Sequence, residues 1–210
     1  MYTCAHCRVL ACYQEKPEKI PANCPVNDVD VYQEIRKEYQ KEENSRFFTT
    51  STRIESEGYC QWPRIREVIE FSRKMGYTKL GVAFCIGLQE EARIAANLFR
   101  KQGFTVSSVI CKNGSIPKEE FGIENEEKLH PGSYEPACNP IGQAIMLNRE
   151  KTDFNVVIGL CVGHDSLFFR YSEAPTTVLV AKDRVLAHNP AGALYCADSY
   201  FADRLEPADG

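Results

Sequence analysis

The sequence predicts an α/β fold in three layers: a parallel sheet of about four strands with helices on both faces. From residue 60 onward, short apolar runs rich in β-branched residues alternate with longer amphipathic stretches. Proline at helix starts and glycine at helix ends separate these segments. A third observation, ten cysteines in 210 residues, points to metal or thiol chemistry.

The expected elements follow one another regularly along the chain. Strands are expected at 79–84, 105–110, 154–160 and 176–181. Helices are expected to begin at the proline or capping residue and to end at the next glycine or charged turn. They cover 63–75, 88–102, 139–149, a short stretch from Asp165, and a last helix from Asn189 that includes Tyr200 and Phe201.

Two parts of the chain differ in character. Residues 1–58 are expected to form an N-terminal cysteine module with a linking helix, and residues 59–210 the α/β domain. Within the first part, residues 29–44 read as an exposed helix, whereas 45–58 are polar and ambiguous. Within the second, residues 112–137 form a long irregular stretch of the kind that is often functional.

The front of the chain carries the motif C-x2-C-x4-C-x11-C, made by Cys4, Cys7, Cys12 and Cys24. Four thiolates suit tetrahedral zinc, or a 4Fe-4S cluster with one cysteine per iron. A segment this short cannot bury much apolar surface, so a metal is expected to hold it together. The alternative is four unliganded thiols in an open segment. The motif indicates a metal without choosing between zinc and iron.

A second set of cysteines falls where strands end or helices begin. In a parallel sheet with connecting helices, these positions meet at the carboxyl edge of the sheet, where such folds bind ligands. We therefore expect the sulfurs of at least three of the last four residues of this set within about 8 Å of one another, a spacing suited to a metal or cluster. The alternative is that each packs as a small buried hydrophobe. The set comprises Cys60, Cys85, Cys111, Cys138 and Cys161, the last four separated by 23 to 27 residues.

Other polar residues map to the same edge. His164 and Asp165 follow the third strand and are the candidate catalytic pair, with His164 as proton donor. Their alternative reading is a helix cap. Lys182 and Arg184 follow the fourth strand, where they would hold an anionic substrate or serve as ordinary surface charges. Cys196 and His188 receive no assigned role.

Composition excludes several classes of protein. The formal net charge is −4, the pI is about 5.7, and no long basic tract occurs, so nucleic acid is not an expected partner. No apolar run approaches the ~20 residues of a membrane span. The first residues lack the basic start and apolar stretch of a secretory signal, which favours a cytoplasmic location with reduced thiols.

Several motifs beside the front cysteines carry a family resemblance. They are Phe84-Cys85-Ile86-Gly87-Leu88, Cys138-Asn139-Pro140-Ile141 with Gln143-Ala144, Gly159-Leu160-Cys161-Val162-Gly163-His164-Asp165, and Lys182-Asp183-Arg184 with His188-Asn189-Pro190. With these motifs, the chain resembles a domain-of-unknown-function family of cysteine-rich proteins, usually labelled metal-binding and found mostly in anaerobic microbes. The resemblance covers nearly the whole chain and implies metal binding, with the anaerobic setting favouring iron–sulfur. It assigns no catalytic role to any residue.

Three functions follow as hypotheses. The first is a cytosolic iron–sulfur redox protein, with a front cluster and a second cysteine site that transfers electrons to a partner or reduces a small molecule. The second is a non-enzymatic zinc or soft-metal protein that stores or senses the metal. The third is a sulfur-transfer enzyme that uses one reactive thiol and no edge metal. The substrate, the electron donor and the oligomeric state are left open.

Overall fold

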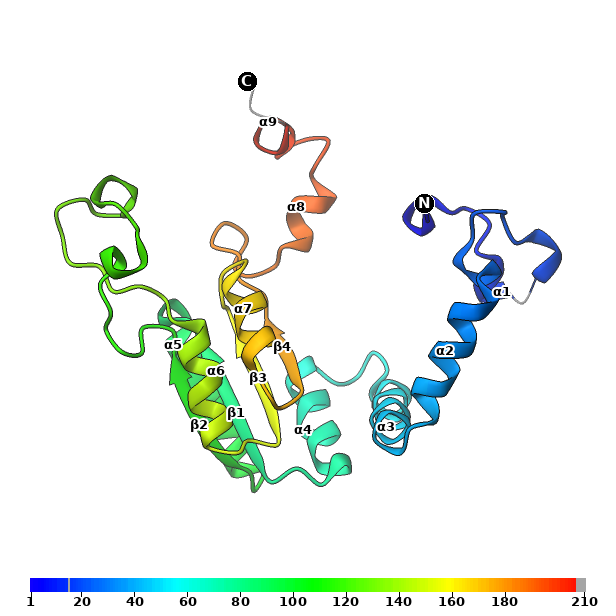
Figure 1. Ribbon diagram of the computed structural model, residues 1–210, viewed down its shortest axis with the longest axis horizontal. Helices are drawn as coiled ribbons and strands as arrows, with labels where there is room; N and C mark the ends of the chain where they lie inside the picture. The colour runs from blue at the N-terminus through cyan, green and yellow to red at the C-terminus, as the bar shows by residue number, and fades with distance from the viewer. Residues whose placement is uncertain (15, 207–210) are drawn as a thin grey trace. The chain divides into compact units, whose positions relative to one another are not determined.

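The computed structural model describes residues 1–14 and 16–206 and divides them into two compact units (Figure 1). The first unit is Met1–Glu57, and the second begins at Gly58. The second unit contains the sheet and the cysteines at its edge. Each unit is described by itself below.

The second unit contains a four-stranded, fully parallel sheet in the order β2-β1-β3-β4, which confirms the predicted fold class. Its central strands are apolar on both faces because helices cover both, and Leu80, Val82, Val156 and Ile158 have no exposed surface. The strands are β1 (Lys79–Phe84), β2 (Thr105–Ile110), β3 (Phe154–Ile158) and β4 (Thr176–Val180).

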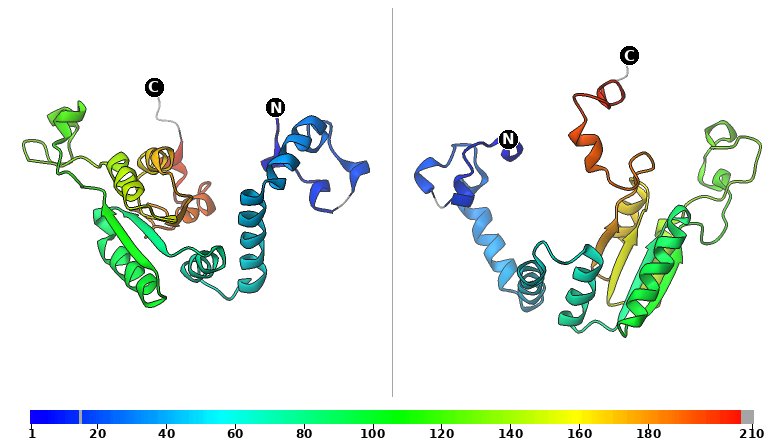
Figure 2. Two further views of the ribbon diagram at one scale, coloured as in Figure 1. Left: turned by 60° about the horizontal axis from the view of Figure 1, so that its bottom comes forward. Right: turned by 180° about the vertical axis from the view of Figure 1, so that it is seen from behind.

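Helices cover both faces of the sheet (Figure 2). The helices α4 (Arg64–Met75) and α5 (Gln89–Lys101) lie on one face, and α6 (Pro140–Arg149) and α7 (His164–Tyr171) pack together on the other. Each face is anchored by a fully buried ring, Phe99 from α5 and Phe168 from α7. Within the described residues, no helix is long and apolar enough to cross a membrane.

The strand order creates a switch point between β1 and β3. From β1 the chain passes through α5 to β2 on one side, whereas from β3 it passes through α7 to β4 on the other. The two connections leave the carboxyl edge toward opposite faces of the sheet (Figure 1). Open α/β sheets bind ligands in the crevice that this arrangement produces. The residues just after β1 and β3 are therefore the first place to look for a site.

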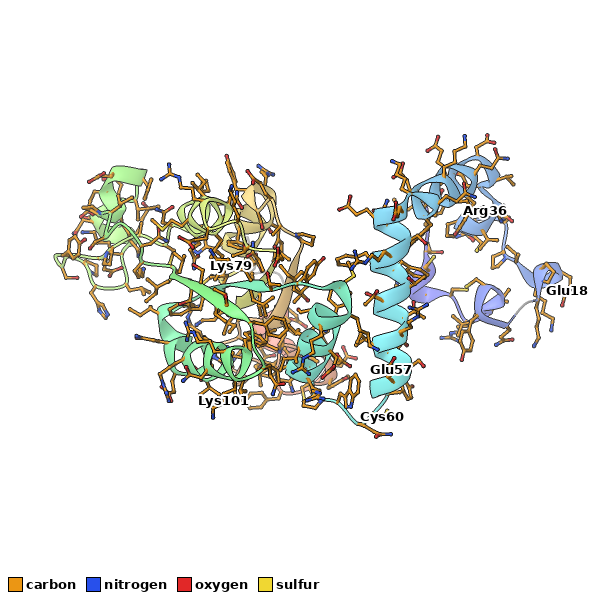
Figure 3. The ribbon with its side chains drawn as sticks, turned by 90° about the horizontal axis from the view of Figure 1, so that it is seen from below. Glu18, Arg36, Glu57, Cys60, Lys79 and Lys101 are labelled. Carbon is orange, nitrogen blue, oxygen red and sulfur yellow. The ribbon has the colours of Figure 1, made fainter. Side chains whose placement is uncertain are left out.

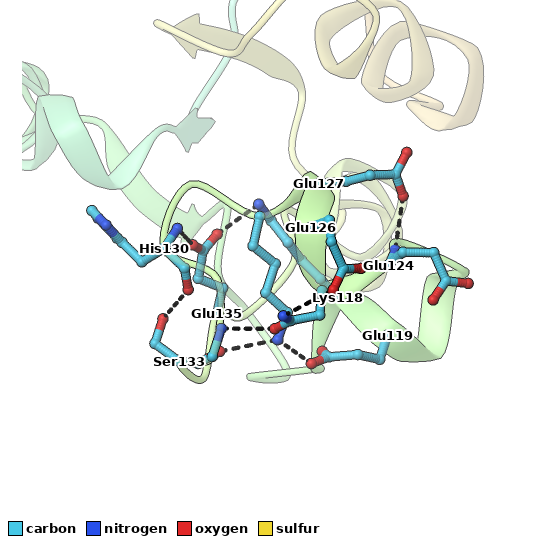
Figure 4. Close-up of polar contacts among 11 residues, drawn as sticks. Lys118, Glu119, Glu124, Glu126, Glu127, His130, Ser133 and Glu135 are labelled. Carbon is cyan, nitrogen blue, oxygen red and sulfur yellow. Dashed lines mark hydrogen bonds and ion pairs between the residues drawn. The ribbon is translucent and has the colours of Figure 1, made fainter.

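The long segment between β2 and α6 is ordered by its own polar contacts. It contains the short 3-10 helices η5 (Lys118–Phe121) and η6 (Asn125–Glu127). Lys118 Nζ pairs with Glu135 Oε2 at 2.7 Å, and Lys128, only 8% exposed, pairs with Glu119 and donates to Ser133 O at 3.0 Å (Figure 4). The segment is thus a folded loop rather than an open one.

The first unit is built from short turns followed by two helices. Asp28 caps α2 (Val29–Gln40), since its Oδ1 accepts from Val31 N at 3.3 Å. The ambiguous stretch 45–58 is helical: it forms most of α3 (Glu42–Gly58), whose Thr50 and Ile54 share a buried face. Its many Ser, Thr and Glu residues hid that face from the sequence pattern. The elements are η1 (Cys4–His6), α1 (Ala11–Gln14), η2 (Pro17–Lys19), η3 (Pro25–Asn27), α2 (Val29–Gln40) and α3 (Glu42–Gly58).

The expected last helix is wrong as a single element. The structure has two short helices instead, α8 (Ala191–Tyr195) and α9 (Ala202–Leu205). Cys196 ends α8 and is followed by turns. The reason is local, because Asp198 and Ser199 follow at once, and such side chains compete with helical hydrogen bonding.

Candidate cysteine site at the sheet edge

Backbone hydrogen bonds place three of the edge cysteines side by side. β1 and β2 run in register, and Cys111 N donates to Phe84 O at 2.8 Å, so Cys111 lies beside Cys85. Asn139 N donates to Cys111 O at 2.7 Å, which brings Cys138 to the other side of Cys111. The sheet and the start of α6 therefore fix the order Cys85–Cys111–Cys138.

The end of β3 brings the fourth cysteine. Cys85 N donates to Ile158 O at 3.0 Å, so β1 and β3 end side by side. Gly159, at φ +64°, then turns the chain, and Cys161 O accepts from His164 N at 3.0 Å to begin α7. This turn carries Cys161 and His164 to the same crevice.

These residues surround one small cavity at the switch point. It is too small to admit a water molecule, and residues from the connections that follow β1, β2 and β3 border it. Cys85 and Cys111 are buried, whereas Cys138 and Cys161 are partly exposed. The structure thus brings together four of the five predicted edge cysteines, with His164 beside them. The lining residues are Cys85, Cys111, Cys138, Pro140, Gln143, Leu160, Cys161 and His164.

Two cations from the loop after β4 contact the sulfurs. Lys182 Nζ donates to Cys85 Sγ at 3.4 Å, and Arg184 Nη2 donates to Cys161 Sγ at 3.1 Å. Asp183, between them, has a structural role, since its Oδ1 accepts from Val185 N and Leu186 N at 2.8 Å each. The site therefore combines thiols with nearby positive charge.

The three adjacent thiols influence one another's ionisation. A hydrogen bond from the Cys111 thiol is the main cause that lowers the pKa of both Cys85 and Cys138, and it outweighs the opposing effect of burial. Lys182 lowers the pKa of Cys85 further, and Lys112 does so for Cys138. The same two contacts raise the pKa of Cys111. These contacts thus favour the ionised form of Cys85 and Cys138 and the protonated form of Cys111.

Gln143 is a site residue to which the sequence pattern assigned no role. Its side chain is fully buried, and its Nε2 donates to Phe84 O at 3.1 Å and to Val109 O at 2.7 Å. Its Oε1 is buried without a hydrogen-bond partner among the described residues. Its place in the sequence could have indicated this role, because Gln143 lies one helical turn after the Asn139-Pro140 start of α6.

Two other predicted site residues, Cys60 and Asp165, are not part of the cavity lining. Cys60 is exposed, has a φ of 55°, and lies on the turn after Gly58 (Figure 3). It does not line the cavity. Asp165 is also absent from the lining, and its Oδ1 accepts from Ser166 N at 2.8 Å. At the opposite, amino edge of the sheet, Lys79 begins β1.

The front cysteines have a partly organised backbone. Cys7 N donates to Cys4 O at 3.1 Å, so the C-x2-C pair lies on one tight turn. Asn23 Nδ2 donates to Thr3 Oγ1 at 2.7 Å, which brings the segments of Cys4 and Cys24 together. Cys4 and Cys12 are exposed, and Cys7 and Cys24 are partly exposed.

No group of three or more His, Cys, Asp or Glu side chains is arranged to hold a metal ion in residues 1–14 and 16–206. At the sheet edge the donor set suits a soft metal, because four sulfurs converge on one cavity. The central thiols interact with one another, and the neighbouring Cys138 and Cys85 raise the pKa of Cys111. A metal at the edge or at the front motif therefore stays a prediction.

Comparison with known proteins shows one family and one relative. The family described as a protein of unknown function (DUF1847) matches residues 24–179, which include all the cysteines that line the cavity. An uncharacterized protein of Methanocaldococcus jannaschii is 46% identical over 202 residues, covering 96% of this chain and 97% of the relative. No solved structure matches the chain.

Proposed function

This chain belongs to DUF1847, a family of proteins of unknown function, and for it we propose a cytosolic metal-binding redox protein. The proposed edge site is an iron–sulfur cluster held by Cys85, Cys111, Cys138 and Cys161. The observation that supports it is that these four cysteines come from the three connections after β1, β2 and β3 and line one cavity at the switch point. The front motif, residues 4–24, is the second proposed metal site.

The surrounding residues suit such a site. A cluster held by thiolates would supply one-electron transfer. Lys182 and Arg184 would balance the negative charge of the sulfurs that they contact. His164, in the cavity wall, would donate a proton to the small molecule that the cluster reduces. The small, largely buried cavity would keep bulk water away from the sulfurs.

The direct test is metal analysis of the full-length protein purified without oxygen. We expect iron and acid-labile sulfide in stoichiometric amounts, with visible absorption. Cys138→Ser should lose one cluster equivalent, whereas the matched variant Cys196→Ser, outside the cavity, should lose none. Stoichiometric zinc in a colourless protein would favour the metal-storage alternative. Protein that binds neither metal after reconstitution would refute metal binding.

A specific observation also favours sulfur transfer as a second candidate function. Hydrogen bonding by Cys111, together with Lys182, keeps the pKa of Cys85 low, which makes it the thiolate best prepared for attack. Its sulfur would attack the terminal sulfur of a persulfide R–S–SH, forming Cys85–S–SH and releasing the thiolate RS⁻. Mass spectrometry after incubation with a persulfide should then show one added sulfur on Cys85. Equal labelling of Cys60, which is exposed, would argue against it.

A further inference from the structure

Cys111 and Cys138 are neighbours that the backbone holds together. Asn139 N donates to Cys111 O at 2.7 Å, so the chain before α6 runs beside the chain that leaves β2. Chains joined by backbone hydrogen bonds in sheets lie about 4.7–4.9 Å apart, and disulfides join Cα atoms about 4.4–6.8 Å apart. A bond between these two cysteines therefore needs no large movement of the backbone.

The two side chains also meet. Both line the cysteine cavity, which is too small to admit a water molecule, and the two thiols interact directly. Ile86 N donates to Cys111 Sγ at 3.3 Å and holds that sulfur from the side of β1. The cavity leaves no room for a ligand between the side chains, but a bond between two thiols needs none.

The two cysteines differ in exposure. Cys138 is partly exposed, whereas Cys111 is only 2% exposed. Cys85, the other neighbour of Cys111, is buried as well. A reagent from solvent therefore meets Cys138 first. Redox-active cysteines commonly have this arrangement, an accessible thiol beside a second thiol that resolves it.

We propose that Cys111 and Cys138 form a reversible disulfide when the metal-free protein meets a small-molecule disulfide, R–S–S–R. The inference goes beyond the proposed function, because forming the bond requires no metal. It also bears on that function, since the bond withdraws two of the four cysteines proposed as cluster ligands. The disulfide and an edge cluster therefore exclude each other.

The chemistry consists of two thiol–disulfide exchanges. In the first, the Cys138 sulfur attacks one sulfur of R–S–S–R, forms the mixed disulfide Cys138–S–S–R, and releases RS⁻, which takes up the proton that Cys138 has lost. In the second, the Cys111 sulfur attacks Cys138 Sγ and releases the other RS⁻, which takes up the proton of Cys111. Two cysteine thiols are oxidised to one disulfide, and R–S–S–R is reduced to two molecules of R–SH.

The test uses the full-length protein, reduced and then freed of metal, with the absence of metal checked by analysis. It is incubated without oxygen with hydroxyethyl disulfide, the remaining thiols are blocked, and the peptides are mapped by mass spectrometry. We expect a peptide pair linked through Cys111 and Cys138 that dithiothreitol separates again. A link from Cys111 to Cys85 instead, or no link at Cys111, would overturn the proposal.

Two serine variants test the order of events. Cys85→Ser removes the other neighbour of Cys111 and should keep the link to Cys138; its loss would count against the proposed pair. Cys138→Ser, at a partly exposed position, should lose the link and leave Cys111 unmodified by the reagent. A mixed disulfide on Cys111 in that variant would contradict the proposal, because it would show that the reagent reaches Cys111 directly.

Metal analysis keeps this inference and the proposed function distinguishable. Protein that forms the disulfide but takes up no metal on reconstitution refutes the proposed function and leaves the inference standing. Protein that takes up a cluster, yet forms no Cys111–Cys138 bond when metal-free, overturns the inference alone.

Discussion

Lys182 and Cys85 are 97 residues apart in the chain, yet Lys182 Nζ donates to Cys85 Sγ at 3.4 Å. The lysine follows β4 and the cysteine follows β1, with β3 between them in the sheet. Gly87 leaves room for this contact, because a Cβ there would lie 3.2 Å from Lys182 Nζ and 3.9 Å from Cys85 Sγ. The absence of one methyl group thus permits the contact between the cation and the thiol.

Gly87→Ala should weaken this contact without unfolding the protein. The atom that must move is the end of a flexible side chain, so the free energy of unfolding should hardly change. Lys182 contributes to the lowered pKa of Cys85, so its displacement raises that pKa. In metal-free protein, the pH midpoint of Cys85 alkylation, followed by peptide mass spectrometry, should move upward.

Lys182→Met is the matched variant for this experiment. It should move the midpoint in the same direction, and the double variant should add little, because both changes remove one contact. An unchanged midpoint in both single variants would show that the lysine does not stabilise the thiolate. Cys111→Ala should give the largest shift, since Cys111 is the main cause of the lowered pKa.

The cap of α6 is a second point that can be tested. Asn139 Oδ1 accepts from Gly142 N at 2.8 Å, directly after Cys138. Asn139→Ala should lower the free energy of unfolding by about 1 kcal/mol, measured by urea denaturation at neutral pH. Asn139→Asp keeps the acceptor and should retain most of that stability. An equal loss in both variants would mean that the contact of Asn139 Nδ2 with Asn113, which both lack, matters more than the cap.

The parallel sheet was predictable because each strand is a short apolar run between clear helix signals. The four predicted strands differ from β1 to β4 by at most two residues at their ends. The same logic predicted that Cys85, Cys111, Cys138 and Cys161 would share an edge, and one cavity contains all four. Strand order was not needed for that step, because every parallel strand ends at the same edge.

Other features of the structure could not be predicted, because they depend on contacts between residues far apart in the sequence. The unpaired oxygen of Gln143 follows from its bonds to Phe84 and Val109, which are 59 and 34 residues away. The helix α3 depends on a face made of Thr50 and Ile54 in an otherwise polar stretch. The position of Cys60 was missed because its turn has a left-handed backbone that an α/β rhythm does not foretell.

Gly159 should tolerate no side chain. Its φ is +64°, and a Cβ would lie 2.7 Å from Cδ1 of Leu88, which has no exposed surface. An alanine in a left-handed conformation costs about 1–2 kcal/mol by itself. Gly159→Ala should therefore lower the free energy of unfolding by more than this amount. Gly122→Ala, at φ +76° with nothing within 4 Å, measures that backbone cost alone. Equal losses in thermal or urea unfolding would mean that Leu88 moves aside freely.

Asp153 provides a dependence of stability on pH. Its Oδ2 accepts from Thr78 N at 2.7 Å and from Lys79 N at 2.8 Å, tying the start of β1 to the start of β3. Burial opposes ionisation of this carboxyl, but the backbone N–H groups of Lys79 and Thr78 outweigh it and lower the pKa. A lowered pKa means that the unfolded chain takes up the proton first as the pH falls.

The stabilisation from Asp153 is therefore complete above the unfolded pKa of about 3.9 and is lost as the pH falls through the lower folded value. Asp153→Asn should lower the free energy of unfolding at pH 7 by about 1–3 kcal/mol, because a charged acceptor is replaced by a neutral one. The difference between the two proteins should shrink on acidification, measured by urea unfolding at a series of pH values. Asp198→Asn, at an exposed position, controls for the change in net charge. A difference that stays constant at all pH values would show that the Asp153 carboxylate charge plays no part.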